Sequence, residues 1–144
     1  MDRSKITLPD VIFSPWFKWE ERSRIPNDDH PGVYVLAHFD KTPRGRADPL
    51  SREIIDIGET TKKTIRSRLN YFHRAAFQGA VGIHSAGETY RLLFKDIDKT
   101  LWVSSFIPID LDEPILMLFI KFIERKLILE YTNRWGKPPV CNKS

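Results

Sequence analysis

Two short strand-like segments followed by an amphipathic helix constrain the fold of this chain more than any other feature. Residues 32–39 and 54–57 are rich in β-branched and aromatic residues, and a glycine ends the second segment. Because consecutive strands usually neighbour one another, we expect a hairpin. Residues 60–77 carry apolar side chains at helical spacing, namely Ile65, Leu69, Phe72 and Ala76. This single stripe predicts a helix that packs on the sheet.

The remaining short segments complete a small sheet. Residues 90–94 and 101–109 have strand-like composition, whereas three glycines mark residues 79–87 as a loop. Four prolines make residues 1–31 irregular, apart from one helical turn over residues 16–24.

A long helix follows the last of these strands. Asp110 and Asp112 are candidate N-caps, and Pro114 suits the first turn. We expect the helix to continue to about Tyr131, before residues 136–139 end regular structure. Because its first half is apolar nearly all round, we expect it to be buried at the centre. The pattern as a whole predicts a small α/β domain with about three strands and two principal helices.

Length and composition limit the protein to one domain. In 144 residues, a second domain would keep fewer than about 75 residues and a marginal core. We expect residues 1–31 to pack as an extension on a domain formed by residues 32–144. The one cysteine, Cys141, excludes an internal disulfide and a cysteine-based zinc site.

The sequence also argues against a membrane protein. Its N-terminus lacks the apolar core of a secretory signal. The longest charge-free apolar run, residues 115–120, is far shorter than the roughly 20 residues that a bilayer requires. We therefore expect a soluble, cytoplasmic protein without a membrane partner.

Positive charge is concentrated in two separate blocks of the chain. The net charge is +4. Residues 41–74 hold nine basic and four acidic side chains, and residues 121–144 hold six and two. If the fold brings these blocks together, they form a basic face suited to phosphates. The alternative is two solvated helix surfaces.

Short motifs follow one another along these elements. They are Gly32-Val33-Tyr34, Asp56-Ile57-Gly58, Arg68-Leu69, Ile123-Glu124 and, near the end, Pro139 and Asn142. The ordered set resembles the GIY-YIG nuclease superfamily over residues 32–142, which is 111 of the 144 residues. The motifs at Arg68 and Glu124 look especially like the nuclease module of the bacterial excision-repair incision subunit.

The resemblance implies a fold and a site. The implied fold is a three-stranded antiparallel sheet flanked by helices (α+β). The implied site holds Mg²⁺ or Mn²⁺ on Glu124. The implied catalytic residues are Tyr34, Arg68, His73, Glu124 and Asn142. One departure is plain, because the second motif begins with Asp56, where the family usually has tyrosine.

The residue types themselves suit hydrolysis of a phosphodiester. A carboxylate such as Glu124 suits a hard cation that keeps most of its waters, and Arg68 offers a charged fork to phosphate oxygens. Tyr34 can orient water or relay its proton, provided that a cation lies close by. The alternatives are a packed core aromatic for Tyr34, and for Glu124 a salt bridge to Lys121 or Arg125, or simple exposure.

Several assignments stay open at this point. Asp56 could be an extra metal ligand, a partner of Arg68, or a strand residue that points away from the site. His73 lies five residues after Arg68 and either serves DNA binding or proton transfer, or is a surface histidine; His84 is a weaker candidate. Asn142 either orients the site or is an ordinary tail residue. Four further cations either contact phosphates of the nucleic-acid backbone or are solvated surface charges: Lys62, Lys63, Arg66 and Arg74.

The sequence therefore predicts a metal-dependent endonuclease that acts on nucleic acid, with DNA as the expected substrate. A homodimer or a partner protein could supply targeting. The alternative is a catalytically impaired module of the same fold that binds nucleic acid, for which Asp56 is the best evidence. A third reading is a protein-interaction domain that binds no nucleic acid.

Overall fold

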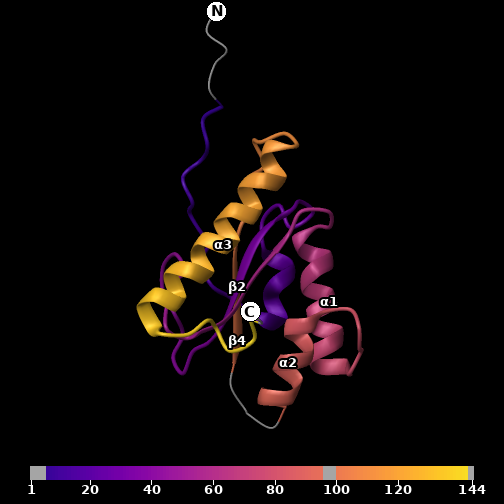
Figure 1. Ribbon diagram of the computed structural model, residues 1–144. Coiled ribbons are helices and arrows are strands. Elements are labelled where there is room, and N and C mark those ends of the chain that lie inside the picture. Colours follow the sequence, from indigo (N-terminus) through magenta and orange to yellow (C-terminus); the bar gives the residue numbers. More distant parts are fainter. Residues whose placement is uncertain (1–5, 96–99, 143–144) are drawn as a thin grey trace, which may run out of the picture.

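A computed structural model describes residues 6–95 and 100–142, in which one sheet is covered by helices on both faces (Figure 1). The strands are β1 (Phe17–Lys18), β2 (Gly32–His38), β3 (Ile54–Thr60) and β4 (Leu101–Phe106). The helices are the 3₁₀ helix η1 (Trp19–Arg24), α1 (Ile65–Gln78), α2 (Ser85–Phe94) and α3 (Ile115–Trp135). The first five residues of the predicted extension and the last two of the predicted domain lie outside the described residues.

The sheet has the strand order β1-β4-β2-β3, and every pair of neighbours is antiparallel. β2 and β3 form the predicted hairpin, with Tyr34 opposite Gly58 and Leu36 opposite Asp56. The predicted class, a small α+β domain with an antiparallel sheet, is confirmed. The expected number of three strands is wrong, because the short β1 adds a fourth strand at the outer edge of β4.

α2 replaces a predicted strand. The tyrosine and phenylalanine at the ends of residues 90–94 fit one face of a helix as well as a strand, since short apolar runs do not distinguish the two. His84 caps the helix, because its Nδ1 accepts a hydrogen bond from the N–H of Gly87 at 3.1 Å. Gly87 also lets α2 approach α1 closely, since a Cβ there would lie 2.7 Å from the Cβ of Ala75.

Apolar side chains divide between the two faces of the sheet. On one face, α3 packs over residues such as Val35 and Ile57. On the other face, α1 and α2 pack over residues such as Leu36. The segment before β2 contributes to both cores, with Trp16 in the first and Trp19 in the second.

α3 differs from its prediction at both ends. It begins at Ile115, directly after Pro114, and neither Asp110 nor Asp112 caps it with a side chain. It also continues one turn beyond the predicted end at Tyr131, to Trp135. Gly136 then ends the helix in the left-handed conformation (φ 89°), as the C-terminal glycine of a helix often does.

The expectation that α3 is buried at the centre is wrong. Leu118 and Phe122 are 62% and 57% exposed. The sheet covers only one side of the helix, where Ile120, Ile123 and Leu127 are buried. Among the described residues, none of the helices combines the length and apolar character that a membrane span requires.

Candidate functional site

Polar side chains from β2, β3, α1, α3, the N-cap of α2 and the C-terminal tail meet at the outer edge of β3. They line a cleft of about 170 Å³, and those with chemical interest are Tyr34, Asp56, Glu59, Arg68, His84, Glu124 and Asn142. Because β3 is the last strand of the sheet, side chains from both faces can reach this edge. The edge strand thereby brings together residues that a central strand would keep apart.

Tyr34 reaches the cleft from β2 by crossing over Gly58. A Cβ on Gly58 would lie 2.3 Å from both Cζ and Oη of Tyr34, so no side chain fits beneath the ring. Tyr34 is 1% exposed, and its hydroxyl lies 2.9 Å from Nε2 of His84. Gly58 is therefore a steric requirement for this position of the tyrosine.

His84 has both ring nitrogens engaged. Its Nδ1 accepts from the N–H of Gly87, so in the neutral ring Nε2 carries the proton and donates it to the hydroxyl of Tyr34. Burial first, and then the charge of Arg68, lower the pKa of His84 to about 3. The imidazole is therefore neutral near pH 7 and fixed in one tautomer.

The phenol of Tyr34 keeps its proton under these conditions. Burial and then the carboxylate of Asp56 raise the pKa of Tyr34 well above its usual 10, and the charge of Arg68 counteracts them in part. Because its oxygen accepts from His84, the O–H of Tyr34 is free to donate in another direction.

Asp56 lies on the same face of the sheet as Tyr34. Tyr34 is paired with Gly58, and Asp56 precedes Gly58 by two residues, a spacing that puts two side chains of a strand on one face. Asp56 is 2% exposed, and its Oδ2 has no hydrogen-bond partner among the described residues. Burial first, and then Glu124, raise the pKa of Asp56 to about 7, whereas Arg68 and hydrogen bonding to Tyr34 lower it. The reading of Asp56 as a residue that points away from the site is therefore wrong.

Glu124 projects from α3 towards the same edge. Its side chain is 17% exposed, and its Oε1 lies 3.4 Å from Nε of Arg125. Burial and then the charge of Glu59 raise the pKa of Glu124, while Arg125 and Lys121 lower it. Glu59, which directly follows Gly58, has a buried Oε2 without a hydrogen-bond partner in the described part of the chain.

The structure distinguishes Arg68 from Arg66. Arg68 lines the cleft, with Nη1 3.5 Å from the carbonyl oxygen of Ile83, and its charge acts on Tyr34 and His84. Arg66 instead pairs with the buried Asp28 at 2.6 Å, outside the residues that line the cleft. Of the two arginines, Arg68 is the one available to a ligand in the cleft.

Asn142 binds the outer edge of β3 with its side-chain amide. Its Oδ1 accepts from the N–H of Ile57 at 2.9 Å, and its Nδ2 donates to the carbonyl oxygen of Ile57 at 2.8 Å. Cys141 adds a backbone hydrogen bond to Ile55. The tail therefore pairs with the strand that carries Asp56 and Gly58.

His73 is not brought to the cleft. Its Nδ1 accepts from Nε1 of Trp19 at 2.9 Å, and the two rings stack. Five residues turn a helix by about 500°, which places His73 roughly 140° around α1 from Arg68. His84, which the sequence favoured less, is the histidine beside Tyr34.

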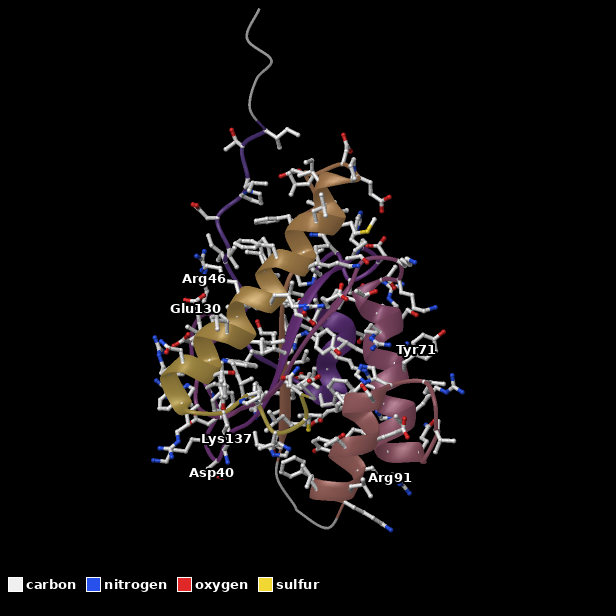
Figure 2. All side chains as sticks on the ribbon, viewed as in Figure 1. Asp40, Arg46, Tyr71, Arg91, Glu130 and Lys137 are labelled. Atoms are coloured by element: carbon white, nitrogen blue, oxygen red, sulfur yellow. The ribbon has the colours of Figure 1, made fainter. Side chains whose placement is uncertain are left out.

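The predicted phosphate contacts lie outside the cleft. Exposed cations in and before α1 are Lys62, Lys63, Arg66 and Arg74. The Nζ of Lys63 lies 5.1 Å from the ring centroid of Tyr71, which projects from the outer side of α1 (Figure 2). Their contact with nucleic acid stays a prediction.

Comparison of the chain with protein-family models, with curated proteins and with solved structures finds no match.

Sequence reasoning missed Glu59 and gave His84 too little weight. Glu59 had a local signal, since it is the acidic residue next to the glycine of a motif. His84 had a weaker one: it precedes a segment with Glu88 in its first turn, which is typical of a helix start. Reading residues 79–87 as a loop hid that signal.

Proposed function

We propose that this protein is a metal-dependent endonuclease of the GIY-YIG type that hydrolyses phosphodiester bonds of nucleic acid, with DNA as the expected substrate. One observation carries the proposal. Tyr34, Arg68 and Glu124, which come from a strand and two helices, line the same cleft. Their side chains combine a water-orienting group, a phosphate-binding cation and an oxygen ligand, which is the set that this hydrolysis needs.

The carboxylates of the cleft fit a hard divalent cation. Asp56 and Glu59 each present a buried oxygen without a hydrogen-bond partner in the described residues, and Glu124 lies beside them. Glu124 would hold Mg²⁺ or Mn²⁺, since these ions prefer oxygen ligands. When bound, the cation would neutralise charge on the phosphate and lower the pKa of a coordinated water.

Tyr34 would orient the attacking water through its hydroxyl. His84 donates to the phenol oxygen and so directs the O–H of Tyr34 away from the imidazole, on the side of Asp56. Because both nitrogens of His84 are engaged and its pKa is lowered to about 3, His84 positions Tyr34 rather than accepting the proton itself.

Arg68 would bind the phosphate and stabilise the charge that develops on its oxygens. Three carboxylates line the cleft, so an anionic substrate would be repelled in the absence of a cation. Arg68 supplies a permanent positive charge at the same place.

Cleavage of plasmid, branched DNA and RNA, each with and without Mg²⁺, tests the proposal. We expect the wild type to cut at least one substrate only with the metal. Arg68→Gln and Glu124→Gln should each slow cleavage by about 100-fold or more. Arg134→Gln and Glu130→Gln, both on α3, are matched controls, since Arg134 is exposed and Glu130 pairs with Lys126 away from the cleft (Figure 2).

Two outcomes would contradict the proposal: no cleavage by the wild type over the whole panel, or full cleavage by both cleft variants. The buried Asp56 in place of tyrosine favours a second candidate, a module that binds nucleic acid without cutting it. That candidate predicts salt-sensitive binding that neither Mg²⁺ nor Glu124→Gln changes.

A further inference from the structure

We infer that Asp56 is a second protein ligand of the divalent cation in this cleft, so that two carboxylates, those of Asp56 and Glu124, hold the ion. The inference rests on the proposed function, because it assumes a cation in the same cleft. It differs from the resemblance in one respect: the resemblance implies that Glu124 is the ligand and assigns no role to an acidic residue at position 56.

The buried carboxylate of Asp56 is the first observation behind the inference. Asp56 is 2% exposed and lines the cleft, yet its Oδ2 has no hydrogen-bond partner in residues 6–95 and 100–142. Burying an unpaired carboxylate oxygen is costly, so native structures retain one only where something compensates. An ion in the cleft would supply the missing partner.

The second observation is the position of Asp56 among the other charged groups. Asp56 lines the same cleft as Glu124, Arg68 and Tyr34, and the charges of Glu124 and Arg68 act on its carboxylate. A metal ion between Asp56 and Glu124 would therefore lie next to the hydroxyl of Tyr34, which would orient water, and next to the guanidinium of Arg68, which would bind phosphate. Glu59 is paired opposite Val33 and so lies on the face that α3 covers, whereas Asp56 lies on the face that carries Tyr34 and is covered by α1, the helix of Arg68.

The third observation is the repulsion between the two carboxylates. Glu124 has one ion pair among the described residues, a 3.4 Å contact with Arg125, whose side chain is 82% exposed. A divalent cation would turn the repulsion between Asp56 and Glu124 into two favourable contacts. In the described chain, no group of three or more His, Cys, Asp or Glu side chains could hold a metal ion. Two carboxylates with water and phosphate are a common way to bind Mg²⁺.

Binding of Mn²⁺ to the purified protein without nucleic acid, followed by electron paramagnetic resonance, tests the inference. We expect Asp56→Asn and Glu124→Gln each to raise the Kd for Mn²⁺ by at least about tenfold, since even residues that only support a ligand change metal affinity by that much. Asp40→Asn should leave the Kd unchanged. Asp40 is exposed and lies away from the cleft (Figure 2).

Thermal unfolding separates loss of a ligand from loss of the fold. In EDTA, Asp56→Asn should unfold at the same temperature as the wild type or higher, because it removes a buried like-charge interaction. Excess Mn²⁺ should raise the unfolding temperature of the wild type more than that of the variant. If the asparagine variant does not fold, Asp56→Ser takes its place in both measurements.

Equal Mn²⁺ affinity in Asp56→Asn and the wild type overturns the inference. Loss of affinity in Glu59→Gln with full affinity in Asp56→Asn also overturns it and assigns Glu59 instead. The readout is independent of cleavage: a protein that binds Mn²⁺ through Asp56 and Glu124 but cuts nothing supports the inference and contradicts the proposed nuclease. A protein that cuts with Mg²⁺ yet binds Mn²⁺ equally well after Asp56→Asn contradicts the inference and supports the proposed nuclease.

Discussion

The ring of Tyr34 lies directly on the backbone of Gly58, with no room for a Cβ between them. The two residues are opposite one another in the antiparallel pair of β2 and β3. This contact lets a side chain from an inner strand reach the cleft at the edge of the sheet, where it meets His84. The position of Tyr34, in the first motif, therefore requires the glycine at position 58, in the second motif.

Gly58→Ala should move Tyr34 and impair both stability and activity. The added methyl group would have to displace the ring, because its nearest contacts would be 2.3 Å. Overpacking of this kind typically costs about 1–3 kcal/mol of the free energy of unfolding. Urea unfolding measures this loss, and it should be smaller when Tyr34→Ala is added, because the double variant has no ring to displace.

Gly45→Ala is the matched control for this prediction. Gly45 has a φ of 71°, and a Cβ added there would meet no atom within 4 Å, so alanine costs about 1 kcal/mol through the backbone alone. We expect Gly45→Ala to keep the cleavage rate per folded molecule. A rate equal to the wild type in Gly58→Ala would show that the contact has no functional role.

His84→Asn should slow cleavage, whereas His73→Asn should not. Asparagine is a good helix N-cap, so the variant at position 84 keeps α2 capped while it loses the hydrogen bond to Tyr34. We expect a loss of about 10- to 100-fold in the cleavage rate, within the range for groups that assist proton transfer. Far-ultraviolet circular dichroism checks that both variants fold, and a larger loss in His73→Asn would contradict the assignment.

Stability should depend on pH through two groups of opposite sign. The pKa of His84 is lowered from 6.5 to about 3, so between these values the unfolded chain binds the extra proton and stability falls as the pH falls. The pKa of Asp56 is raised from 3.8 to about 7, so there the folded chain binds the extra proton and stability falls as the pH rises. The two effects oppose one another in the wild type.

Urea unfolding in EDTA between pH 4 and pH 7 measures these contributions. Relative to the wild type, Asp56→Asn should lose more stability at the acid end, because the effect of His84 is then unopposed. His84→Asn should lose more stability towards neutral pH. Identical pH profiles for all three proteins would contradict both assignments.

Asn142→Ala should destabilise the edge of β3. The substitution removes two hydrogen bonds to Ile57, each worth about 0.5–1.5 kcal/mol, so the expected loss is about 1–3 kcal/mol. Chemical denaturation measures it, with Asn133→Ala on the exposed side of α3 as the control. An unchanged free energy of unfolding in Asn142→Ala would show that the tail does not support the site.

Local patterns predicted the elements that depend on neighbours in the chain. The hairpin of β2 and β3, the helix α1 with its apolar stripe and the turn at η1 all follow from spacing and composition over short stretches. The fourth strand did not, because Phe17 pairs with Val103, a partner far away in the sequence. The exposed face of α3 also escaped prediction, since composition does not tell how many sides of a helix are covered.

The residue types and their order, with Tyr34, Arg68 and Glu124 as the candidates, were determined by the sequence alone. Only the tertiary structure decided which histidine lies beside Tyr34 and where Asp56 points. Both depend on packing between distant segments: α2 approaches α1 at Gly87 and brings in His84, and the edge position of β3 exposes Asp56 to Glu124. Helical and strand periodicities act over a few residues and carry no information about such contacts.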